Sequence, residues 1–519
     1  MDNQHRTIIG KDIIESLTLG MYEDSRFIFR EYIQNAADQI DKAVAQKVLP
    51  SRKDGKIWIN IDKDEKKITI EDNATGIKKT EVVKILKNIA QSTKQRGIDK
   101  GFRGIGRLGG IAYCDELIFE TSYKGETTKS VMIWSAKELK DIINNRSKEE
   151  EAVKVIDQVT DFDFSNEDEN KHYFRVILEN VSNALLLDFR NIQEYLSMIA
   201  PAPLHPRFTL IEKIYSSIKA DNLSIDEYTI YVNSDAIFKA YTTKIYEGIE
   251  NNKKAIDEIF DIQTFTLKMD DDSFLAWGWY GISNFKKQIP EKGNIARGIR
   301  LRSGNIQIGN AYCLNKLHKE QRGNFYFFGE VHALHKDLIP NARRDYFLDT
   351  HALKIFEDKL KNLFKNDLYK LYHFASSIRS KQKRIDRLTT FKSEYQQKID
   401  TGFTNKDEAE VYKEKFTDLK DQAEKATQEL NKIKQDVTDT KSPQSKILNR
   451  TCNGEDVTTR TNPQEIYEND KLKYLTDNLS KLTKKDRKLI SRVYSVIDKV
   501  LPKEIAENLK LKINEELSD

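Results

Sequence analysis

The chain of 519 residues is poor in cysteine and proline and contains no long apolar run. Its three cysteines, Cys114, Cys313 and Cys452, lie far apart and form no C-x-x-C pair. An odd number of distant cysteines supports neither a disulfide framework nor a structural zinc site, so a reducing compartment is expected. The first ten residues are polar and no stretch of about 18 apolar residues occurs, so we expect a cytoplasmic protein without a signal peptide or transmembrane helix.

An excess of charge of one sign is also missing. The 86 Lys and Arg residues stand against 82 Asp and Glu residues, which gives a net charge of +4. This balance does not favour a polyanion partner for the whole molecule, because such partners select clustered basic residues. Charged residues make up 32% and hydrophobic residues 38% of the chain, a composition typical of long, solvated helices. The length suggests about three domains and at least one full-sized core.

The periodicity and composition of the sequence change along the chain. An α+β mixture of helical and strand periods reaches a proline-rich segment at 200–206, and a second α+β segment follows it. Beyond it, Lys, Glu, Gln and Leu dominate with almost no Gly or Pro, which predicts long helices or a coiled-coil hairpin. The expected division is 1–200, 201–350, 351–436 (helical or coiled coil), 437–465 (linker) and 466–519 (a small helical region).

The first long helix is expected over residues 27–45, because Phe29, Ile33 and Ala36 recur on one face at the i, i+4, i+7 spacing. Alternating apolar residues predict strands in both α+β segments. The charged stretch 137–171 is expected to form a helix with a surface loop. The predicted strands cover residues 57–61, 68–71, 116–122, 130–134 and 173–178, then 228–233, 264–269, 274–280, 298–308 and 325–332.

A polar stripe runs along this first helix. Glu31, Asn35 and Asp38 follow the i, i+4, i+7 spacing, so all three point the same way. A carboxylate one turn from a carboxamide suits metal-assisted phosphoryl chemistry, because one group orients a water as general base and the other gives an oxygen to Mg²⁺. A solvated helix face is the alternative interpretation of this spacing.

Two further segments bear on nucleotide binding. Asp72-Asn73-Ala74-Thr75-Gly76 follows a predicted strand, and residues 101–106 read Gly-Phe-Arg-Gly-Ile-Gly. The second segment opens an apolar helix expected at 108–113, so its backbone N–H groups and the helix N-terminus are able to hold phosphate. Missing Cβ atoms allow the backbone to approach a ligand closely. A lone G-x-x-G-x-G often marks only a turn, so the order of the elements is the stronger signal.

Taken together, these residues resemble the GHKL superfamily, which includes gyrase, the ninety-kilodalton heat-shock chaperones, histidine kinases and the mismatch-repair protein MutL. The resemblance implies an α+β sandwich of Bergerat type, with helices packed on a mixed sheet. It also implies that ATP is bound with Mg²⁺ beneath a movable lid and is hydrolysed to ADP and phosphate.

The resemblance assigns a role to each matching position. Glu31 matches the base that activates water, Asn35 the Mg²⁺ ligand, and Asp72 the carboxylate that accepts the adenine amino group. Gly76 matches the glycine beneath the adenine, and Asp38 an acid near the ribose or adenine pocket. The residues matching the lid and the phosphate-binding turn are Ser92, Thr93, Lys94, Gly101, Phe102, Arg103, Gly104, Ile105 and Gly106, with the lid spanning Ser92 to Arg103.

Two positions depart from the family pattern. Ala74 stands where the family's Asp-x-Gly-x-Gly has its first glycine. No residue near 173–178 matches the threonine that joins the adenine water network in the family. Both departures bear on adenine selectivity rather than on phosphate binding. They support one alternative interpretation, a nucleotide-binding scaffold that does not hydrolyse ATP.

The second α+β segment carries a further resemblance. Residues 299–308 and 328–345 are similar to the middle domain of the heat-shock-ninety chaperones, a ribosomal-S5-like α+β fold. In that family an arginine of the corresponding loop reaches the γ-phosphate when the lid closes; Arg344 is the first match and Arg343 the second. A guanidinium can donate in bidentate fashion to the transferring phosphoryl group. Alternatively, the two arginines pair with surface carboxylates.

These resemblances imply a Mg²⁺-dependent ATPase that switches conformation. We expect a chaperone or remodelling factor that acts on a protein client, and a homodimer whose N-terminal domains associate when ATP binds. A histidine kinase is disfavoured, because only His5 precedes the site. The sequence leaves open whether residues 351–517 hold two copies together constitutively.

The alternative function is that of a microrchidia-like ATPase clamp on DNA, for example in a bacterial defence or repair system. The long charged helices after residue 351 resemble the coiled-coil insertions of that family in style. A solvated helix face is the favoured interpretation of their basic residues. The basic cluster consists of Arg379, Lys381, Lys383, Arg384 and Arg387.

Overall fold

The computed structural model describes most of the chain and divides it into two compact units, residues 1–369 and 370–519. None of the helices in the described part is long and apolar enough to cross a membrane. The described residues are 8–18, 24–89, 106–145, 150–248, 252–452, 472–479 and 481–518.

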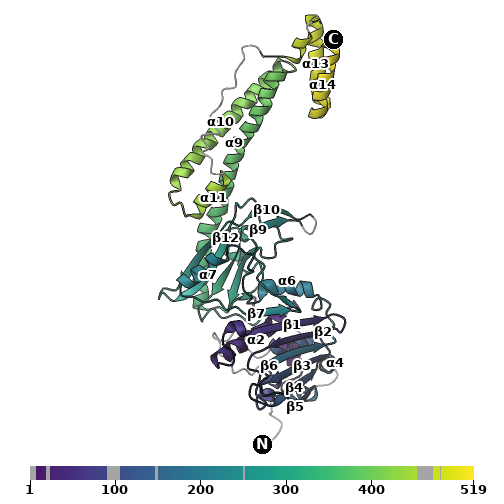
Figure 1. Ribbon diagram of the computed structural model, residues 1–519, viewed down its shortest axis with the longest axis vertical. Helices are drawn as coiled ribbons and strands as arrows, with labels where there is room; N and C mark the ends of the chain where they lie inside the picture. The colour runs from purple at the N-terminus through teal and green to yellow at the C-terminus, as the bar shows by residue number, and fades with distance from the viewer. Residues whose placement is uncertain are drawn as a thin grey trace. The chain divides into compact units, whose positions relative to one another are not determined.

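An eight-stranded sheet forms the base of the first unit, in the order β5-β4-β3-β6-β2-β1-β7-β8 (Figure 1). Its strands are amphipathic: on β1, Ile57 and Ile59 are buried and Trp58 points to the other face. The strand β7, which follows the proline-rich segment, pairs in parallel with β1. The strands are β1 (Lys56–Asp62), β2 (Lys67–Asp72), β3 (Glu116–Ser122), β4 (Thr128–Ser135), β5 (Thr160–Asn166), β6 (Tyr173–Glu179), β7 (Thr229–Val232) and β8 (Asp235–Ala236).

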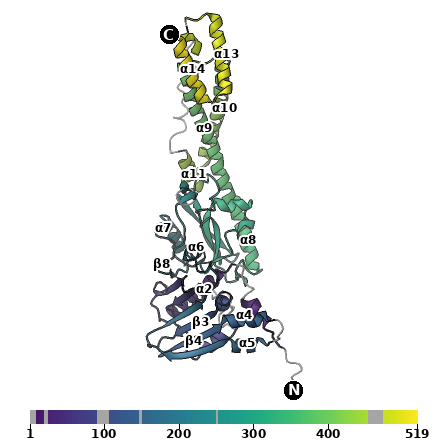
Figure 2. The ribbon, with the colours of Figure 1, turned by 90° about the vertical axis from the view of Figure 1, so that its right-hand side faces the viewer.

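Helices cover one face of this sheet (Figure 2). The longest is α2, which spans the predicted residues and buries Ile33, Ala37 and Ile40 in the core. The apolar helix expected at 108–113 is a 3-10 helix, η3. The helices are α1 (Asp12–Thr18), α2 (Phe27–Ala45), η2 (Arg52–Asp54), α3 (Val82–Lys87), η3 (Gly106–Ala112), α4 (Ala136–Asn144), α5 (Ala152–Gln158) and α6 (Phe189–Ile199).

The stretch 137–171 differs from the prediction of a helix with a surface loop. It contains most of α4, all of α5, and the edge strand β5, which pairs antiparallel with β4. Phe162 and Phe164 alternate along β5 with Asp161 and Asp163, so the acidic residues occupy the outer face of the sheet. Because the segment is highly charged, its sequence predicted a helix and a surface loop, and this alternation was missed.

A second, five-stranded sheet follows in the order β11-β12-β15-β13-β14. The strand expected over 298–308 is a hairpin, because Gly304 and Asn305 adopt left-handed backbone angles of 57° and 60°. The elements are α7 (Ile211–Ala220), β9 (Lys244–Glu247), β10 (Lys254–Glu258), β11 (Asp261–Lys268), β12 (Phe274–Ile282), β13 (Gly298–Ser303), β14 (Ile306–Ile308), η5 (Asn315–Leu317), η6 (Gln321–Tyr326), β15 (Phe328–Ala333), α8 (His351–Leu363) and the π-helix η7 (Phe364–Leu368).

The core beneath this second sheet contains a buried ion cluster. Lys239 Nζ donates to Glu330 Oε2 at 2.8 Å, and Arg302 Nε lies 2.5 Å from Glu330 Oε1. The two cations hold the pKa of Glu330 well below its usual range despite its burial, and burial lowers the pKa of Lys239 to about 8. Arg302 Nη2 also donates to the Met198 carbonyl at 2.8 Å, which ties the end of α6 to this sheet.

The second unit is helical, as the sequence predicts beyond residue 351. Helices α9 and α10 form a hairpin at Gly402, whose φ is +103°, around an aromatic cluster that includes Phe391, Tyr395 and Tyr412. Within the basic cluster, Lys381 forms an ion pair with Glu429 at 3.2 Å. The elements are α9 (Tyr369–Thr401), α10 (Lys406–Asp436), α11 (Pro443–Thr451), η8 (Leu475–Asn478), α13 (Lys484–Val500) and α14 (Lys503–Ser518).

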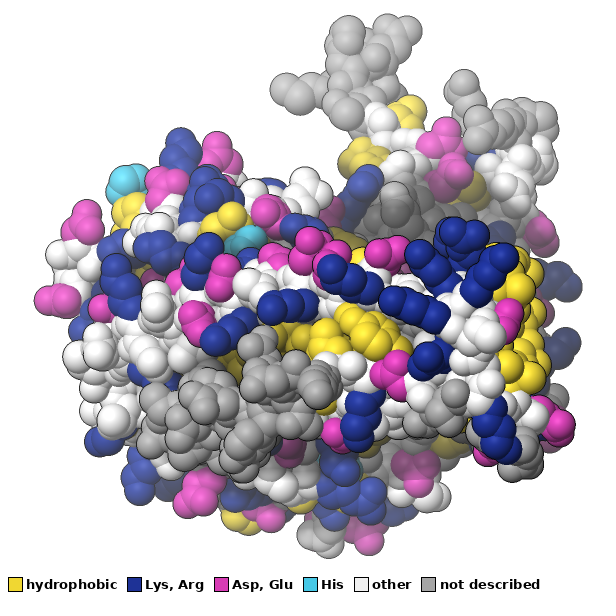
Figure 3. All heavy atoms as spheres, turned by 90° about the horizontal axis from the view of Figure 1, so that it is seen from above, with side chains coloured by type: hydrophobic (Ala, Val, Ile, Leu, Met, Phe, Trp, Pro, Cys, Tyr) yellow, Lys and Arg dark blue, Asp and Glu magenta, His cyan; other side chains and the backbone are white. Residues whose placement is uncertain are grey.

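Aliphatic side chains remain exposed on the second unit. Along α13 they recur at spacings of four, three and four residues and form a narrow seam. Figure 3 shows hydrophobic side chains at the surface among Lys and Arg side chains. The α13 seam consists of Leu489, Val493, Val496 and Val500.

Candidate functional site

The site is built on the polar stripe of α2. Glu31 is only 8% exposed, and Asn35 and Asp38 are partly buried on the same stripe. The opposite side of the helix, with Ile33 and Ile40, packs in the sheet core, which fixes the direction of the stripe. Burial of Glu31 does not fit the alternative of a solvated helix face.

The end of the Gly-rich segment lies against Glu31. A Cβ added to Gly106 would lie 2.4 Å from Glu31 Oε2, so a side chain there would displace the carboxylate. Tyr32 reinforces this contact: its hydroxyl donates to the Arg107 carbonyl and accepts from the Gly110 N–H, both at 3.1 Å. The structure therefore brings Gly106 to the proposed base. The other predicted lid and phosphate residues, 92–94 and 101–105, lie outside the described part of the chain.

Asp72 ends β2 and is buried. Its Oδ1 accepts the Ala74 N–H at 3.0 Å, and burial raises the pKa of Asp72 to about 7. Gly76 has φ +70°, and a Cβ there would lie 1.9 Å from the Ser122 carbonyl oxygen, so glycine is required. Ala74 has no left-handed backbone angle, so the family's first glycine can be replaced here without backbone strain.

Two polar residues beside this motif were not anticipated. Thr121, fully buried on β3, accepts the Ile77 N–H at 2.9 Å and donates to the Tyr173 carbonyl at 2.9 Å. His172 Nδ1 lies 2.7 Å from the Ala74 carbonyl oxygen, to which it can donate. Every second residue of β3 up to Thr121 is buried. A polar residue at such a buried position is the feature of the sequence that indicates a role for Thr121.

The arginine loop of the second sheet docks on α2. Arg344 is buried and donates through Nη1 to Gln34 Oε1. Arg30 Nη2 donates to the Arg343 carbonyl at 3.2 Å and lies 3.5 Å from Glu31 Oε1. Arg344 thus points toward the helix of the proposed base, whereas the Arg343 side chain is exposed. Arg344 remains the first candidate for the γ-phosphate contact. The alternative, in which it pairs with a surface carboxylate, does not fit its burial.

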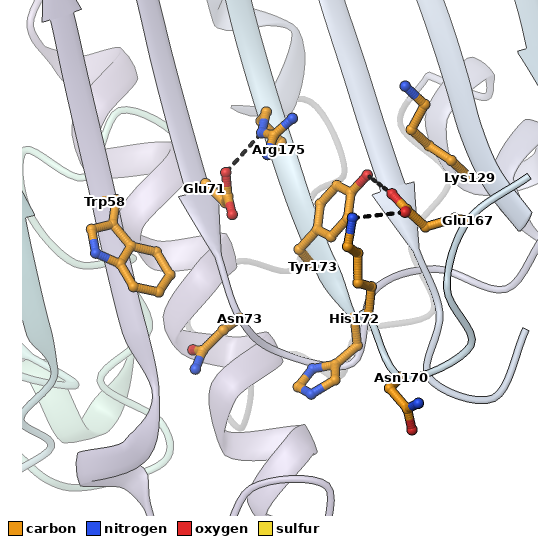
Figure 4. A pocket seen from close by; sticks show the side chains of 10 residues that line it. Trp58, Glu71, Asn73, Lys129, Glu167, Asn170, His172, Tyr173 and Arg175 are labelled. Atoms are coloured by element: carbon orange, nitrogen blue, oxygen red, sulfur yellow. Dashed lines mark hydrogen bonds and ion pairs between the residues drawn. The ribbon is translucent and has the colours of Figure 1, made fainter. Parts of the chain in front are cut away.

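A groove of about 500 Å³ lies on the opposite, outer face of the sheet (Figure 4). Several of its polar groups are already paired: Arg175 Nε donates to Glu71 at 2.7 Å, and Lys171 and Tyr173 both donate to Glu167. Side chains that satisfy one another are not poised for a ligand. We therefore do not assign the nucleotide to this groove.

The polar stripe of α2 includes few oxygen ligands for Mg²⁺. Within the described ranges, no three His, Cys, Asp or Glu side chains gather as a metal site. Magnesium in nucleotide sites needs only one or two protein oxygens, because phosphates and water supply the rest. The Asn35 carboxamide, on the same stripe as Glu31, meets that limited requirement.

Comparison with known proteins bears on the first sheet and its helices. Residues 25–164 match the family model described as histidine kinase-, DNA gyrase B-, and HSP90-like ATPase. The chain contains a GHKL-type ATPase domain. This result confirms the superfamily resemblance and the α+β fold with a helical C-terminal region.

Part of the chain is similar to curated chaperone proteins. The chaperone protein HtpG of Campylobacter jejuni strain RM1221 is 27% identical over 186 residues, which are 33% of this chain and 30% of the relative. HtpG of Buchnera aphidicola subsp. Cinara cedri is 35% identical over 96 residues, or 17% of the chain and 15% of the relative. HtpG of Coxiella burnetii strain RSA 331 is 34% identical over 87 residues, or 16% and 14%. The chain therefore spans less than a third of these relatives.

Proposed function

We propose that this protein hydrolyses ATP with Mg²⁺ and uses the reaction to switch conformation, as a chaperone or remodelling ATPase acts on a protein client. The observation that carries this proposal is the docking of Arg344 on α2, three residues along the helix from Glu31. A general base and a second cation for the γ-phosphate are the two groups that a GHKL domain needs beside its metal and glycine loop.

In the proposed reaction, Glu31 accepts a proton from the water that attacks the γ-phosphate, and ADP leaves with the electron pair of the broken P–O bond. Arg344 donates to the phosphoryl oxygens as they separate from ADP. Asn35 would hold Mg²⁺, which would neutralise phosphate charge when bound. Asp72 accepts the adenine amino group, and Gly76 lets the backbone approach the base.

The two sheets of the first unit are positioned to couple during this reaction. Arg302 and the Met198 carbonyl join the second sheet to the end of α6, and the arginine loop joins it to α2. A change at the γ-phosphate that moves Arg344 is therefore transmitted to the second sheet. We infer that two copies associate while ATP is bound and separate after hydrolysis.

Two substitutions test the proposal. Glu31→Ala should keep ATP binding and lower ATP turnover by at least about 100-fold, because the general base is lost. Arg344→Ala should lower turnover by a similar factor with little change in ATP affinity, because its contact forms only in the transition state.

Arg343→Ala is the matched comparison, since this neighbouring side chain is exposed, and it should retain at least about half of the activity. Wild-type turnover in Glu31→Ala would remove Glu31 as the base. Failure of the wild-type protein to bind ATP in calorimetry with Mg²⁺ would remove the whole proposal.

A further inference from the structure

Gln34 occupies a position on α2 that the nucleotide motif leaves without a role. It is buried, it lies three residues after Glu31 and one before Asn35, and it therefore shares their stripe. Its Oε1 accepts a hydrogen bond from Arg344 Nη1. The two residues are 310 positions apart in the sequence, so this bond joins the ATPase domain to the loop after the second sheet.

The loop that presents Arg344 is held in an unusual conformation. Arg344 has φ +53°, a left-handed angle that an arginine adopts only when its surroundings require it. Its backbone N–H donates to the Asn341 carbonyl at 3.2 Å, and its carbonyl accepts the Gly309 N–H at 2.8 Å. The backbone is therefore fixed at both sides of the residue. The remaining freedom of the guanidinium is limited by Gln34.

The chemistry of an amide suits this task. A carboxylate at position 34 would neutralise the guanidinium, whereas the Gln34 amide accepts a hydrogen bond and leaves the positive charge available. On α2, residues three positions apart lie about 5–6 Å from each other at Cβ. A guanidinium held at Gln34 is thus close to the carboxylate of Glu31, where phosphoryl charge develops in the proposed reaction.

We propose that Gln34 is a positioning residue that holds the Arg344 guanidinium on α2 beside Glu31 for ATP hydrolysis. This inference rests on the ATPase function proposed above. It adds a residue that acts through Arg344 rather than on ATP itself. Loss of the amide lets the guanidinium leave its place, so the rate of hydrolysis falls while ATP still binds through the glycine loop and Asp72.

Gln34→Met tests the proposal, because methionine keeps the length and helix propensity of the side chain and removes the acceptor. We expect kcat to fall about tenfold and the KM for ATP to stay within about twofold. In an Arg344→Ala background, the same substitution should lower kcat by no more than about twofold, because the group that Gln34 positions is gone. Gln34→Ala is the second variant should the methionine variant fail to bind ATP.

Gln39→Ala is the control. Gln39 lies on the same helix, and its side chain makes no hydrogen bond among the described residues. It should retain wild-type kcat and KM. A general weakening of α2 would instead lower kcat equally with and without Arg344, and that result would overturn the positioning role.

The other outcomes separate this inference from the proposed function. Normal turnover in Gln34→Met together with impaired turnover in Arg344→Ala would reject the role of Gln34 alone. Normal turnover in Arg344→Ala would reject the arginine assignment on which it rests.

Discussion

The second sheet, in the first unit, and the helix α13, in the second unit, place charge and hydrophobic surface in opposite ways. In the first unit, Lys239, Arg302 and Glu330 are almost fully buried together in the core of the second sheet. In the second unit, most charged residues of the long helices face solvent, and the aliphatic seam of α13 is exposed. The second sheet removes charged groups from water, whereas α13 leaves aliphatic groups exposed to it.

Buried charges require partners with fixed geometry, because an unpaired ion in a core costs several kcal/mol. A sheet that contains them therefore holds its strands in one arrangement, which suits a site that joins α2 to the loop of Arg343 and Arg344. Exposed aliphatic residues at heptad spacing do not need partners inside their own chain. They are removed from water when another helix packs on them. The first unit thus suits chemistry and the second suits association.

The largest effect is expected at Glu330. Glu330→Gln removes the carboxylate that faces both Lys239 and Arg302 and leaves these cations buried without it. We expect the free energy of unfolding to fall by about 3–5 kcal/mol, as for other buried pairs that lose one member. Urea denaturation followed by circular dichroism would measure it.

Glu179→Gln provides the matched surface substitution. Glu179 pairs with Lys67 at 2.8 Å, but both side chains are more than one-third exposed, so its loss should cost less than about 1 kcal/mol. Equal costs at Glu179 and Glu330 would mean that burial of the ion cluster does not increase its contribution to stability.

A pH-dependent effect is expected at Asp72, whose pKa burial raises to about 7. Between pH 4 and 7 the folded protein keeps a proton on Asp72 that the unfolded chain releases. The contribution of this proton to stability is therefore complete below pH 4 and is lost as the pH rises through 7. Relative to Asp72→Asn, the wild-type free energy of unfolding should fall by about 1.4 kcal/mol per pH unit in this window.

Thermal and urea denaturation of both proteins at each pH would measure this difference, in which all other titrating groups cancel. A wild-type curve parallel to that of the asparagine variant would show that Asp72 is ionised in the folded protein below pH 7. The buried environment described for the Asp72 carboxylate would then be wrong.

Sequence periodicity predicted the parts of the site that lie on one regular element. The i, i+4, i+7 spacing placed Glu31, Asn35 and Asp38 on one stripe of α2, where the structure has them. Gln34 belongs to the same stripe and was overlooked, because a glutamine by itself indicates no chemistry. Thr121 was overlooked because a threonine is common in strands whether or not it is buried.

Contacts between distant segments could not be predicted from spacing. Lys239 and Glu330 are 91 residues apart, and nothing in either local pattern indicates that they share a core. The hairpin between β13 and β14 depends on left-handed angles at Gly304 and Asn305, a pair typical of turns, yet the apolar residues on both sides suggested one strand. The assigned roles of the site residues and the domain boundaries stay predictions.

The smallest effect on the free energy of unfolding is expected for a substitution in the exposed seam of α13. Val496 in the seam and Val411 on α10 are 58% and 59% exposed, so Val496→Lys and Val411→Lys should each change the free energy of unfolding by less than about 0.5 kcal/mol. Their effects on association should differ. A lysine in the seam places a charge where a second helix would pack, so Val496→Lys should shift a dimer toward monomer in light scattering, and Val411→Lys should not.

Folding measurements are made on dilute protein so that association does not contribute. If Val496→Lys lowered the free energy of unfolding by more than about 1 kcal/mol and Val411→Lys did not, the seam would be packed within its own chain. If neither variant changed the mass of a dimeric wild-type protein, the seam would not join the copies. Two copies would then be held together by the ATPase domains alone, and dimerisation should depend on ATP.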